Sequence, residues 1–320
     1  MTLARRSLVA LAALAALVVA APSRAAAIGR ERSGDFKAEY LFNFATSAGT
    51  LNQSFQGITY DAVGKELYAV NNGIVRVFNA AGVEVFAFGD EAELGGTIGA
   101  APLESGDIVL LASGATEWWL LRTSFRGELK ERLSLKGIPA DFPMKEFHPV
   151  ALRYAKGKLF VADKAGMRVL VLDPDGAYVT SYDLAAVLGA EEKRSDLGVR
   201  GFNVDREGNL LFTVSPEFKA YVLSPGGELR TFGRPGSSAG RFGVVAGIAS
   251  DEEGRFYVTD VLRCQIIVFD KNFEFLGEFG GRGWDPENVI GPTEVAVANG
   301  RVYVIQGARR GVSVFMVTPG

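Results

Sequence analysis

The stretch that decides the fold runs from Phe242 to Gly280 and reads FGVVAGIASDEEGRFYVTDVLRCQIIVFDKNFEFLGEFG. Apolar and polar residues alternate in four short runs, separated by clusters of Gly, Asp and Asn, as in strands joined by tight turns. The predicted strands are Gly247–Ser250, Arg255–Thr259, Gln265–Phe269 and Glu274–Phe279. Four such strands form an antiparallel meander, which needs neighbours of the same kind to bury both of its faces.

The same order of strands and turns recurs along the chain. Equivalent units begin near Gly57, Thr97, Pro149, Gly201, Gly247 and Glu294. A period of about forty to fifty residues with four strands per repeat indicates a β-propeller. The last unit has three strands, and Phe36–Phe44 is an unpaired strand before the first unit. We therefore expect an all-β, six-bladed β-propeller of four-stranded antiparallel blades, in which the N-terminal strand closes the last blade.

The second unit has the weakest pattern, and its plausible strands are Asp107–Ala112, Trp118–Thr123 and Glu128–Leu133. Because Trp118 and Trp119 are adjacent, their rings point to opposite faces of a strand. We expect one ring to fill the core between blades and the other to be exposed, where it could stack on a sugar or a peptide.

The fifth unit carries a family resemblance. Its pattern Gly247-Ile-Ala-x-Asp-x-x-Gly-x-x-Tyr-Val-x-Asp260 resembles the NHL repeat, and the tract Arg234-Pro-Gly-Ser-Ser-Ala-Gly-Arg-Phe242 resembles the loop that joins NHL blades. The resemblance covers most of residues 28–320 and implies a six-bladed propeller that binds proteins, peptides, RNA or sugars through loops on one face. Some related propellers are enzymes that hold calcium or zinc at the channel mouth, so the fold leaves the function open.

Residues 1–27 are predicted to be a secretory signal. Arg5 and Arg6 precede the apolar run Leu8–Ala21, and Ala25–Ala27 offers small residues for cleavage. The run is too short for a membrane span. Since Arg5-Arg6 is also a loose twin-arginine match, both the general and the twin-arginine export routes stay open. We expect residues 28–320 to form a single propeller domain that is exported, and either periplasmic or secreted.

Composition excludes several kinds of chemistry. The formal net charge of −3 argues against nucleic-acid binding. One histidine, His148, and one cysteine, Cys264, are too few for a zinc centre, and no G-x-S-x-G motif accompanies His148. We interpret Cys264 as a small buried residue. The sequence therefore predicts no catalytic residue and no cofactor, with calcium as the alternative.

The calcium alternative depends on a recurrent polar position where the second strand of a unit ends. The residues there are Asn71, Asp163, Ser215, Asp260 and Gln306. Such a side chain can cap a turn by bonding to the nearby backbone, and an Asp163–Arg168 pair would then tie the hairpin together. Alternatively, the carboxylates of Asp163 and Asp260 could hold Ca²⁺ at the channel mouth.

Three long loops between units are the predicted place for specificity, because loops on a rigid scaffold carry function. They are Lys136–Pro149, Asp183–Arg200, where Leu184–Leu188 is a predicted helical turn, and Gly280–Pro292. The candidate partner-binding residues are Lys145, Glu146, Phe147, His148, Arg194, Arg200, Arg282 and Trp284. Aromatic and Arg side chains are common in interface cores, although packing between blades is the alternative for the aromatic ones.

Three functional hypotheses follow. The first is an exported, non-enzymatic scaffold that binds a protein or peptide of the cell envelope. The second is a calcium-dependent hydrolase or lactonase that uses Asp163 and Asp260. The third is a carbohydrate-binding propeller, which depends on exposed aromatic side chains.

Overall fold

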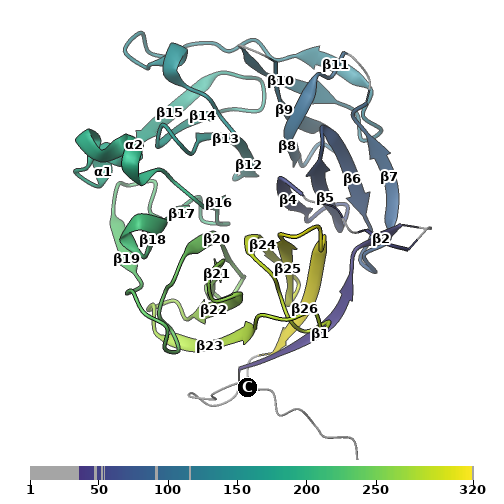
Figure 1. The fold of residues 1–320 in the computed structure, drawn as a ribbon. Helices are drawn as coiled ribbons and strands as arrows, with labels where there is room; N and C mark the ends of the chain where they lie inside the picture. Colours follow the sequence, from purple (N-terminus) through teal and green to yellow (C-terminus); the bar gives the residue numbers. More distant parts are fainter. Residues whose placement is uncertain are drawn as a thin grey trace, which may run out of the picture. The chain divides into compact units, whose positions relative to one another are not determined.

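The alternating segments of the repeats fold into six four-stranded antiparallel sheets arranged as blades around an axis (Figure 1). The computed structural model describes residues 36–318, apart from 47–48, 52, 54, 91–92 and 115–116. The predicted all-β, six-bladed propeller is confirmed. The predicted signal, residues 1–27, lies outside the described residues.

Each blade runs from an inner strand near the axis to an outer strand at the rim (Figure 1). Blade 1 contains β4 (Gly57–Asp61), β5 (Glu66–Asn71), β6 (Ile74–Phe78) and β7 (Glu84–Phe88). Blade 2 contains β8 (Gly96–Pro102), β9 (Ile108–Ser113), β10 (Trp118–Thr123) and β11 (Leu129–Arg132). Blade 3 contains β12 (Ala151–Ala155), β13 (Lys158–Asp163), β14 (Arg168–Leu172) and β15 (Tyr178–Asp183). Blade 4 contains β16 (Phe202–Val204), β17 (Leu210–Val214), β18 (Lys219–Leu223) and β19 (Leu229–Phe232). Blade 5 contains β20 (Val245–Ser250), β21 (Phe256–Asp260), β22 (Gln265–Phe269) and β23 (Phe275–Gly280). Blade 6 contains β24 (Pro292–Ala298), β25 (Arg301–Gln306), β26 (Val312–Thr318) and β1 (Lys37–Asn43).

Blade 6 is built from both ends of the described chain. Strand β1 pairs antiparallel with β26, from Lys37 opposite Thr318 to Asn43 opposite Ser313, with one register shift between Tyr40 and Phe42. The predicted closure of the ring by the N-terminal strand is therefore confirmed. A small ladder of β2 (Ala45–Thr46) and β3 (Gly49–Thr50) follows β1.

Blade 2 contains the three strands predicted for it and an inner strand, β8, that the sequence pattern did not place. Neither of its two indole rings is exposed, so the predicted exposed tryptophan is a wrong expectation. Trp118 packs edge-on against Phe147, with ring centroids 5.6 Å apart. Trp119 packs against the core between blades 1 and 2, and the Arg132 guanidinium lies 5.0 Å from its ring.

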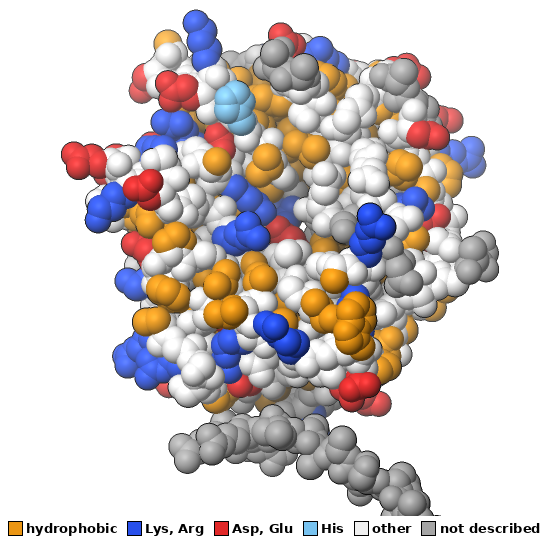
Figure 2. Space-filling view, in the orientation of Figure 1, with side chains coloured by type: hydrophobic (Ala, Val, Ile, Leu, Met, Phe, Trp, Pro, Cys, Tyr) orange, Lys and Arg blue, Asp and Glu red, His pale blue; other side chains and the backbone are white. Residues whose placement is uncertain are grey.

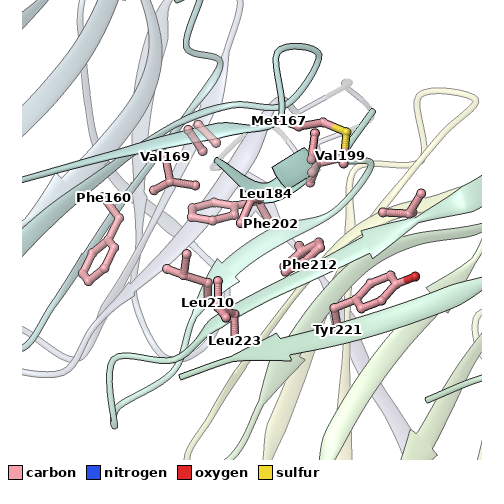
Figure 3. Packing of buried hydrophobic residues seen from close by; sticks show 14 of the residues in the cluster. Phe160, Met167, Val169, Leu184, Val199, Phe202, Leu210, Phe212, Tyr221 and Leu223 are labelled. Carbon is pink, nitrogen blue, oxygen red and sulfur yellow. The ribbon is translucent and has the colours of Figure 1, made fainter. Parts of the chain in front are cut away.

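Six apolar clusters form the core of the described chain, one at each interface between neighbouring blades. Figure 3 shows the interface of blades 3 and 4, where Phe160 and Val169 face Phe202 and Phe212. Leu184, from the loop between these blades, completes the cluster. Since each large apolar side chain contributes about 1.5–3 kcal/mol when buried, the interfaces hold the ring together.

The inner strands of blades 4, 5 and 6 approach each other closely. A Cβ on Gly201 would lie 2.0 Å from the Ala246 carbonyl oxygen, and a Cβ on Gly247 would lie 2.6 Å from Glu294 Cα. Only glycine fits at these two positions. The approach fixes the backbone of Glu294 beside the channel axis.

In the part of the chain that the structure describes, helical structure is confined to loops. It comprises the α-helices α1 (Leu184–Val187) and α2 (Arg194–Leu197) and the 3₁₀ turns η1 (Met144–Glu146), η2 (Glu191–Lys193) and η3 (Ser215–Glu217). The predicted helical turn after Asp183 is thus confirmed as α1. Among the described residues, no helix has the length and apolar character needed to cross a membrane.

Candidate functional site

A cavity of about 780 Å³ opens at the mouth of the channel. Its walls come from the loops that enter blades 1, 3 and 4, from the turn after β13 and from the start of β24. Below it, a narrow throat passes between inner strands and is lined by Arg153, Lys164 and Glu294. Basic and acidic side chains gather around the central hollow in Figure 2. The cavity therefore combines loop residues with charged groups on the axis.

The loop before blade 3 presents two predicted residues to this cavity. The ring of Phe147 is buried between Trp118 and Phe142, with centroids 5.6 and 5.2 Å away. Phe147 therefore anchors the loop, as in the alternative in which the aromatic residues pack between blades. Glu146 and His148, on either side of it, are exposed and line the cavity.

The loop between blades 3 and 4 contains two of the predicted residues, Arg194, which is held by hydrogen bonds, and Arg200, which is exposed. Arg194 donates two hydrogen bonds to Asp183, at 2.8 and 2.6 Å, and a third to the Gly166 carbonyl. Burial alone would raise the pKa of Asp183, but hydrogen bonds from Arg194 and the Ala186 N–H bring this pKa below its ordinary value. Arg200 is exposed and lines the cavity.

The loop between blades 5 and 6 does not line the cavity. Arg310 holds it by donating hydrogen bonds to backbone carbonyls, including those of Gly283 at 2.8 Å and Asn288 at 3.3 Å. Trp284 is 75% exposed, and the Arg310 guanidinium lies 5.5 Å from its ring. Arg282 is exposed and donates to the Leu262 carbonyl, at 3.2 Å. The structure thus brings together Glu146, His148 and Arg200, while Lys145, Arg282 and Trp284 lie outside the cavity lining.

In blades 3, 5 and 6, the recurrent polar position fastens the loop that enters the blade. Asp260 is fully buried, and its carboxylate accepts four N–H groups, from Gly243 (2.5 Å), Val244 (3.1 Å), Leu262 (3.1 Å) and Arg263 (2.9 Å). Asp163 accepts the N–H groups of His148 (3.0 Å) and Gly166 (2.7 Å). Gln306 accepts the Ile290 N–H at 2.7 Å. For Asp163 and Asp260 this arrangement confirms the interpretation that the side chain caps a local turn, whereas Gln306 binds a backbone N–H sixteen residues away.

Two details of that interpretation are wrong. Arg168 lies opposite Asp163 in the ladder, but its closest carboxylates are those of Glu146, at 3.8 Å, and Asp183, at 3.9 Å. No Asp163–Arg168 ion pair forms between these described residues; the Asp163 oxygens accept backbone N–H groups instead.

The second error concerns blade 4. The strand pairing places Val214 opposite Lys219, as it places Asp163 opposite Arg168 and Asp260 opposite Gln265. Val214 therefore occupies the recurrent position, and Ser215 lies one residue beyond it. The sequence pattern pointed to Ser215, one residue too far along the chain, because Ser215 is the first polar residue after the strand.

The calcium alternative finds limited support in the geometry. Asp163 lines the cavity, whereas Asp260 does not. Within the described ranges, no group of three or more His, Cys, Asp or Glu side chains is placed to hold a metal ion. Cys264 is buried, as interpreted, with its Sγ 3.5 Å from the Val261 carbonyl oxygen.

The charged throat, consisting of Arg153, Lys164 and Glu294, was not among the predicted site residues. Lys164 Nζ lies 2.8 Å from Glu294 Oε1, and Arg153 Nη2 lies 3.6 Å from Glu294 Oε2. Burial lowers the pKa of Arg153, and the negative charge of Glu294 opposes that shift. The signal that could have found the throat is a charged residue within an inner strand, as at Arg153 in β12 and Glu294 in β24.

Comparisons with known proteins support the fold. The sequence matches no protein-family model and no curated protein. A solved streptogramin B lyase is similar with a TM-score of 0.60 and 14% identity, over 89% of this chain and 98% of that chain. A protein of unknown function from Bacteroides thetaiotaomicron has a TM-score of 0.61 and 12% identity, over 89% and 77%. A gluconolactonase from Xanthomonas campestris has a TM-score of 0.57 and 15% identity, over 90% and 91%.

At identities this low, the likeness shows the six-bladed propeller fold alone. The NHL resemblance is not confirmed by any family model and stays a prediction. Function has to be argued from the cavity.

Proposed function

We propose that this propeller is an exported, non-enzymatic binding module of the NHL type. It binds a protein or peptide of the cell envelope at the channel mouth. The observation that carries the proposal is the cavity of about 780 Å³ framed by the loops that enter blades 3 and 4. A rigid ring that presents adaptable loops around a concave site is a common arrangement for recognition.

The side chains around the cavity favour binding over catalysis. His148 is exposed, and its hydrogen bond to Asp163 is donated by its backbone N–H and not by its imidazole ring. An acid–base pair would need a second group within hydrogen-bond reach of the reacting proton. The Asp163 carboxylate already accepts two N–H groups, and Glu146 faces Arg168. These contacts stabilise the loops and leave Arg200 as an exposed recognition group.

Site-specific photocrosslinking in envelope extracts tests the proposal. A photoreactive residue replaces His148 at the cavity, and in a matched protein it replaces Glu252, which lines a smaller cavity of about 210 Å³. The two cavities share no lining residue, although Arg153 of the throat also lines the smaller one. We expect one partner to crosslink from position 148 and not from position 252. The purified partner should then bind with an affinity that falls in Arg200→Ala. Equal crosslinking from both positions would contradict the proposal.

The enzyme alternative has one observation in its favour, since the single histidine lines the cavity. Two structural neighbours are a streptogramin B lyase and a gluconolactonase, so a streptogramin B and gluconolactone are the substrates to test, with and without Ca²⁺. Turnover that disappears in His148→Ala would replace the binding module with an enzyme. Turnover that disappears when calcium is removed would favour the calcium-dependent hydrolase.

A further inference from the structure

We propose that the entrance of the charged throat binds a carboxylate group of the partner. This inference rests on the proposed binding role of the same cavity and adds the chemistry of the ligand. The carboxylate belongs to a peptide, either at its C-terminus or on an acidic side chain.

The throat carries more positive than negative charge. Arg153 and Lys164 share the single carboxylate of Glu294, at 3.6 and 2.8 Å. The side chains of Arg153 and Glu294 are each 10% exposed, and that of Lys164 is 19% exposed. A buried charge without a partner is unfavourable, so the second cation stabilises an additional anion at this place.

Arg153 in the throat also leaves one of its hydrogen-bond donors unused among the described residues. Arg153 is 8% exposed, and its Nη1 donates to the Leu152 carbonyl at 2.9 Å. Its buried Nε has no hydrogen-bond partner among the described residues. A guanidinium offers donors in a planar fork that matches the two oxygens of a carboxylate.

Arg200 extends the positive charge from the throat to the rim. The neighbouring Val199 donates its N–H to the Lys164 carbonyl at 2.7 Å, which places the backbones of the two cationic residues side by side. Arg200 is exposed and lines the cavity together with Lys164. It forms no ion pair within the described part of the chain. Lys164 and Arg200 can therefore reach the same ligand group.

The remaining acids of the cavity, Asp163 and Glu146, are engaged with groups outside the throat. Both Asp163 oxygens accept backbone N–H groups, and Glu146 lies 3.8 Å from Arg168. The shape favours one small anionic group on a larger ligand, because the wide cavity narrows to a throat with room for about 10 Å³. The carboxylate sits at the entrance of the throat, and the rest of the peptide occupies the cavity beside the loops.

Two blocked peptides test the inference with the purified full-length protein. The probes are N-acetyl-trialanine with a free C-terminal carboxylate and the same peptide as its amide. Calorimetry at constant ionic strength measures the Kd of each. We expect saturable binding of the acid and none of the amide. N-acetyl-aspartate amide then shows whether a side-chain carboxylate binds as well as the C-terminal one.

Four variants locate the site. Lys164→Met and Arg200→Gln should each raise the Kd of the acid peptide about tenfold or more, because a charge-assisted hydrogen bond is lost. The matched controls Lys271→Met and Arg126→Gln change exposed cations outside the cavity and should leave the Kd unchanged. Arg200 is exposed, so its variant keeps the test valid if a change in the throat prevents folding.

The outcomes separate this inference from the proposed function. Equal binding of acid and amide, or an equal effect of the control variants, overturns the carboxylate site. If the crosslinked partner binds Lys164→Met and Arg200→Gln as tightly as the unchanged protein, the carboxylate inference fails while the binding module stands. If no partner crosslinks from position 148 and neither peptide binds, both fail.

Discussion

Blade 5 pairs its charged side chains with partners in the same blade or in the loop beside it, whereas blade 3 directs two cations towards the channel axis. In blade 5, Asp251 accepts hydrogen bonds from Arg255 Nε at 2.6 Å and from the Tyr257 hydroxyl at 2.9 Å. Arg263 binds both oxygens of Glu278, at 2.8 and 2.9 Å. In blade 3, Arg153 and Lys164 instead share Glu294 of blade 6.

The strand pairing shows which residues are equivalent. Arg153 lies opposite Phe160 in blade 3, and Ala249 lies opposite Tyr257 in blade 5. Lys164 follows Asp163 as Val261 follows Asp260. Two aliphatic residues of blade 5 thus correspond to two cations of blade 3. The aspartate that both blades share fastens a loop, and the residues that differ mark the proposed site.

The largest effect should come from the shared aspartate. Asp260→Ala removes a buried carboxylate that accepts four N–H groups, so the free energy of unfolding should fall by about 3–5 kcal/mol. Asp163→Ala should cost less, because two N–H groups lose their acceptor. Urea unfolding measures both. Equal losses would mean that the two blades use this position in the same way.

The next effect concerns the throat. Glu294→Gln leaves Arg153 and Lys164 without a counter-charge and should lower the free energy of unfolding by about 2–4 kcal/mol. Lys164→Met keeps the Arg153–Glu294 pair and should cost about 1 kcal/mol. A Glu294→Gln protein as stable as the unchanged one would show that Glu294 does not offset the charge of the two cations.

A smaller effect on the free energy of unfolding is expected at Tyr257 of blade 5, which occupies the position of Phe160 in blade 3. Tyr257→Phe removes the hydrogen bond to Asp251 and should lower the free energy of unfolding by about 1–2 kcal/mol at neutral pH. Tyr60→Phe, at a partly exposed tyrosine whose hydroxyl accepts an exposed hydrogen bond from Asn299, should lower it by less, about 0.5 kcal/mol. An equal loss of unfolding free energy in the two variants would contradict this difference between blades 5 and 3.

Alkaline pH sharpens the same contrast. Burial raises the pKa of Tyr257, and the charges of Asp251 and Glu253 add to the rise. Below the unfolded pKa of about 10, both states keep the proton, and the stability is fully present. Above it, the unfolded chain releases the proton first, so stability falls as pH rises. Tyr257→Phe should flatten this fall between about pH 9 and 11 in unfolding titrations.

The smallest effect should come from the loop that joins blade 3 to blade 4. Arg194→Met removes both hydrogen bonds to Asp183 and should cost about 1 kcal/mol. Because the pKa of Asp183 is lowered in the folded state, this contribution is present above the unfolded pKa of about 3.9 and is lost as pH falls through the folded pKa. The stability difference between the variant and the unchanged protein should therefore shrink in acid. A difference that is constant from pH 7 to about pH 2 would contradict it.

The fold was predictable because each blade is a local pattern. The stretch Phe242–Gly280 contains the strands and turns of blade 5, and their order repeats elsewhere. The inner strand of blade 2 was missed because Gly96–Pro102, with two glycines and two adjacent alanines, lacks clear alternation. Closure by β1 could be inferred because blade 6 lacked a strand.

The site was only partly predictable. Glu146, His148 and Arg200 were found because they lie on long loops, and the structure places them around one cavity. The contact of Arg153 and Lys164 with Glu294 crosses more than a hundred residues of sequence and exists only once the ring is closed. No spacing in the sequence encodes that contact.

Ring closure also has a consequence for the order of events during synthesis. Strand β1 is made before the first five blades, and its ladder partner β26 is made after them. A nascent chain that carries five complete blades therefore still has an open ring and an unpaired strand edge, which can join another chain. The seven residues of β26, Val312–Thr318, close the ring by pairing with β1. Translation that stops shortly before them leaves a protein with nearly all of its blades and no stable closure.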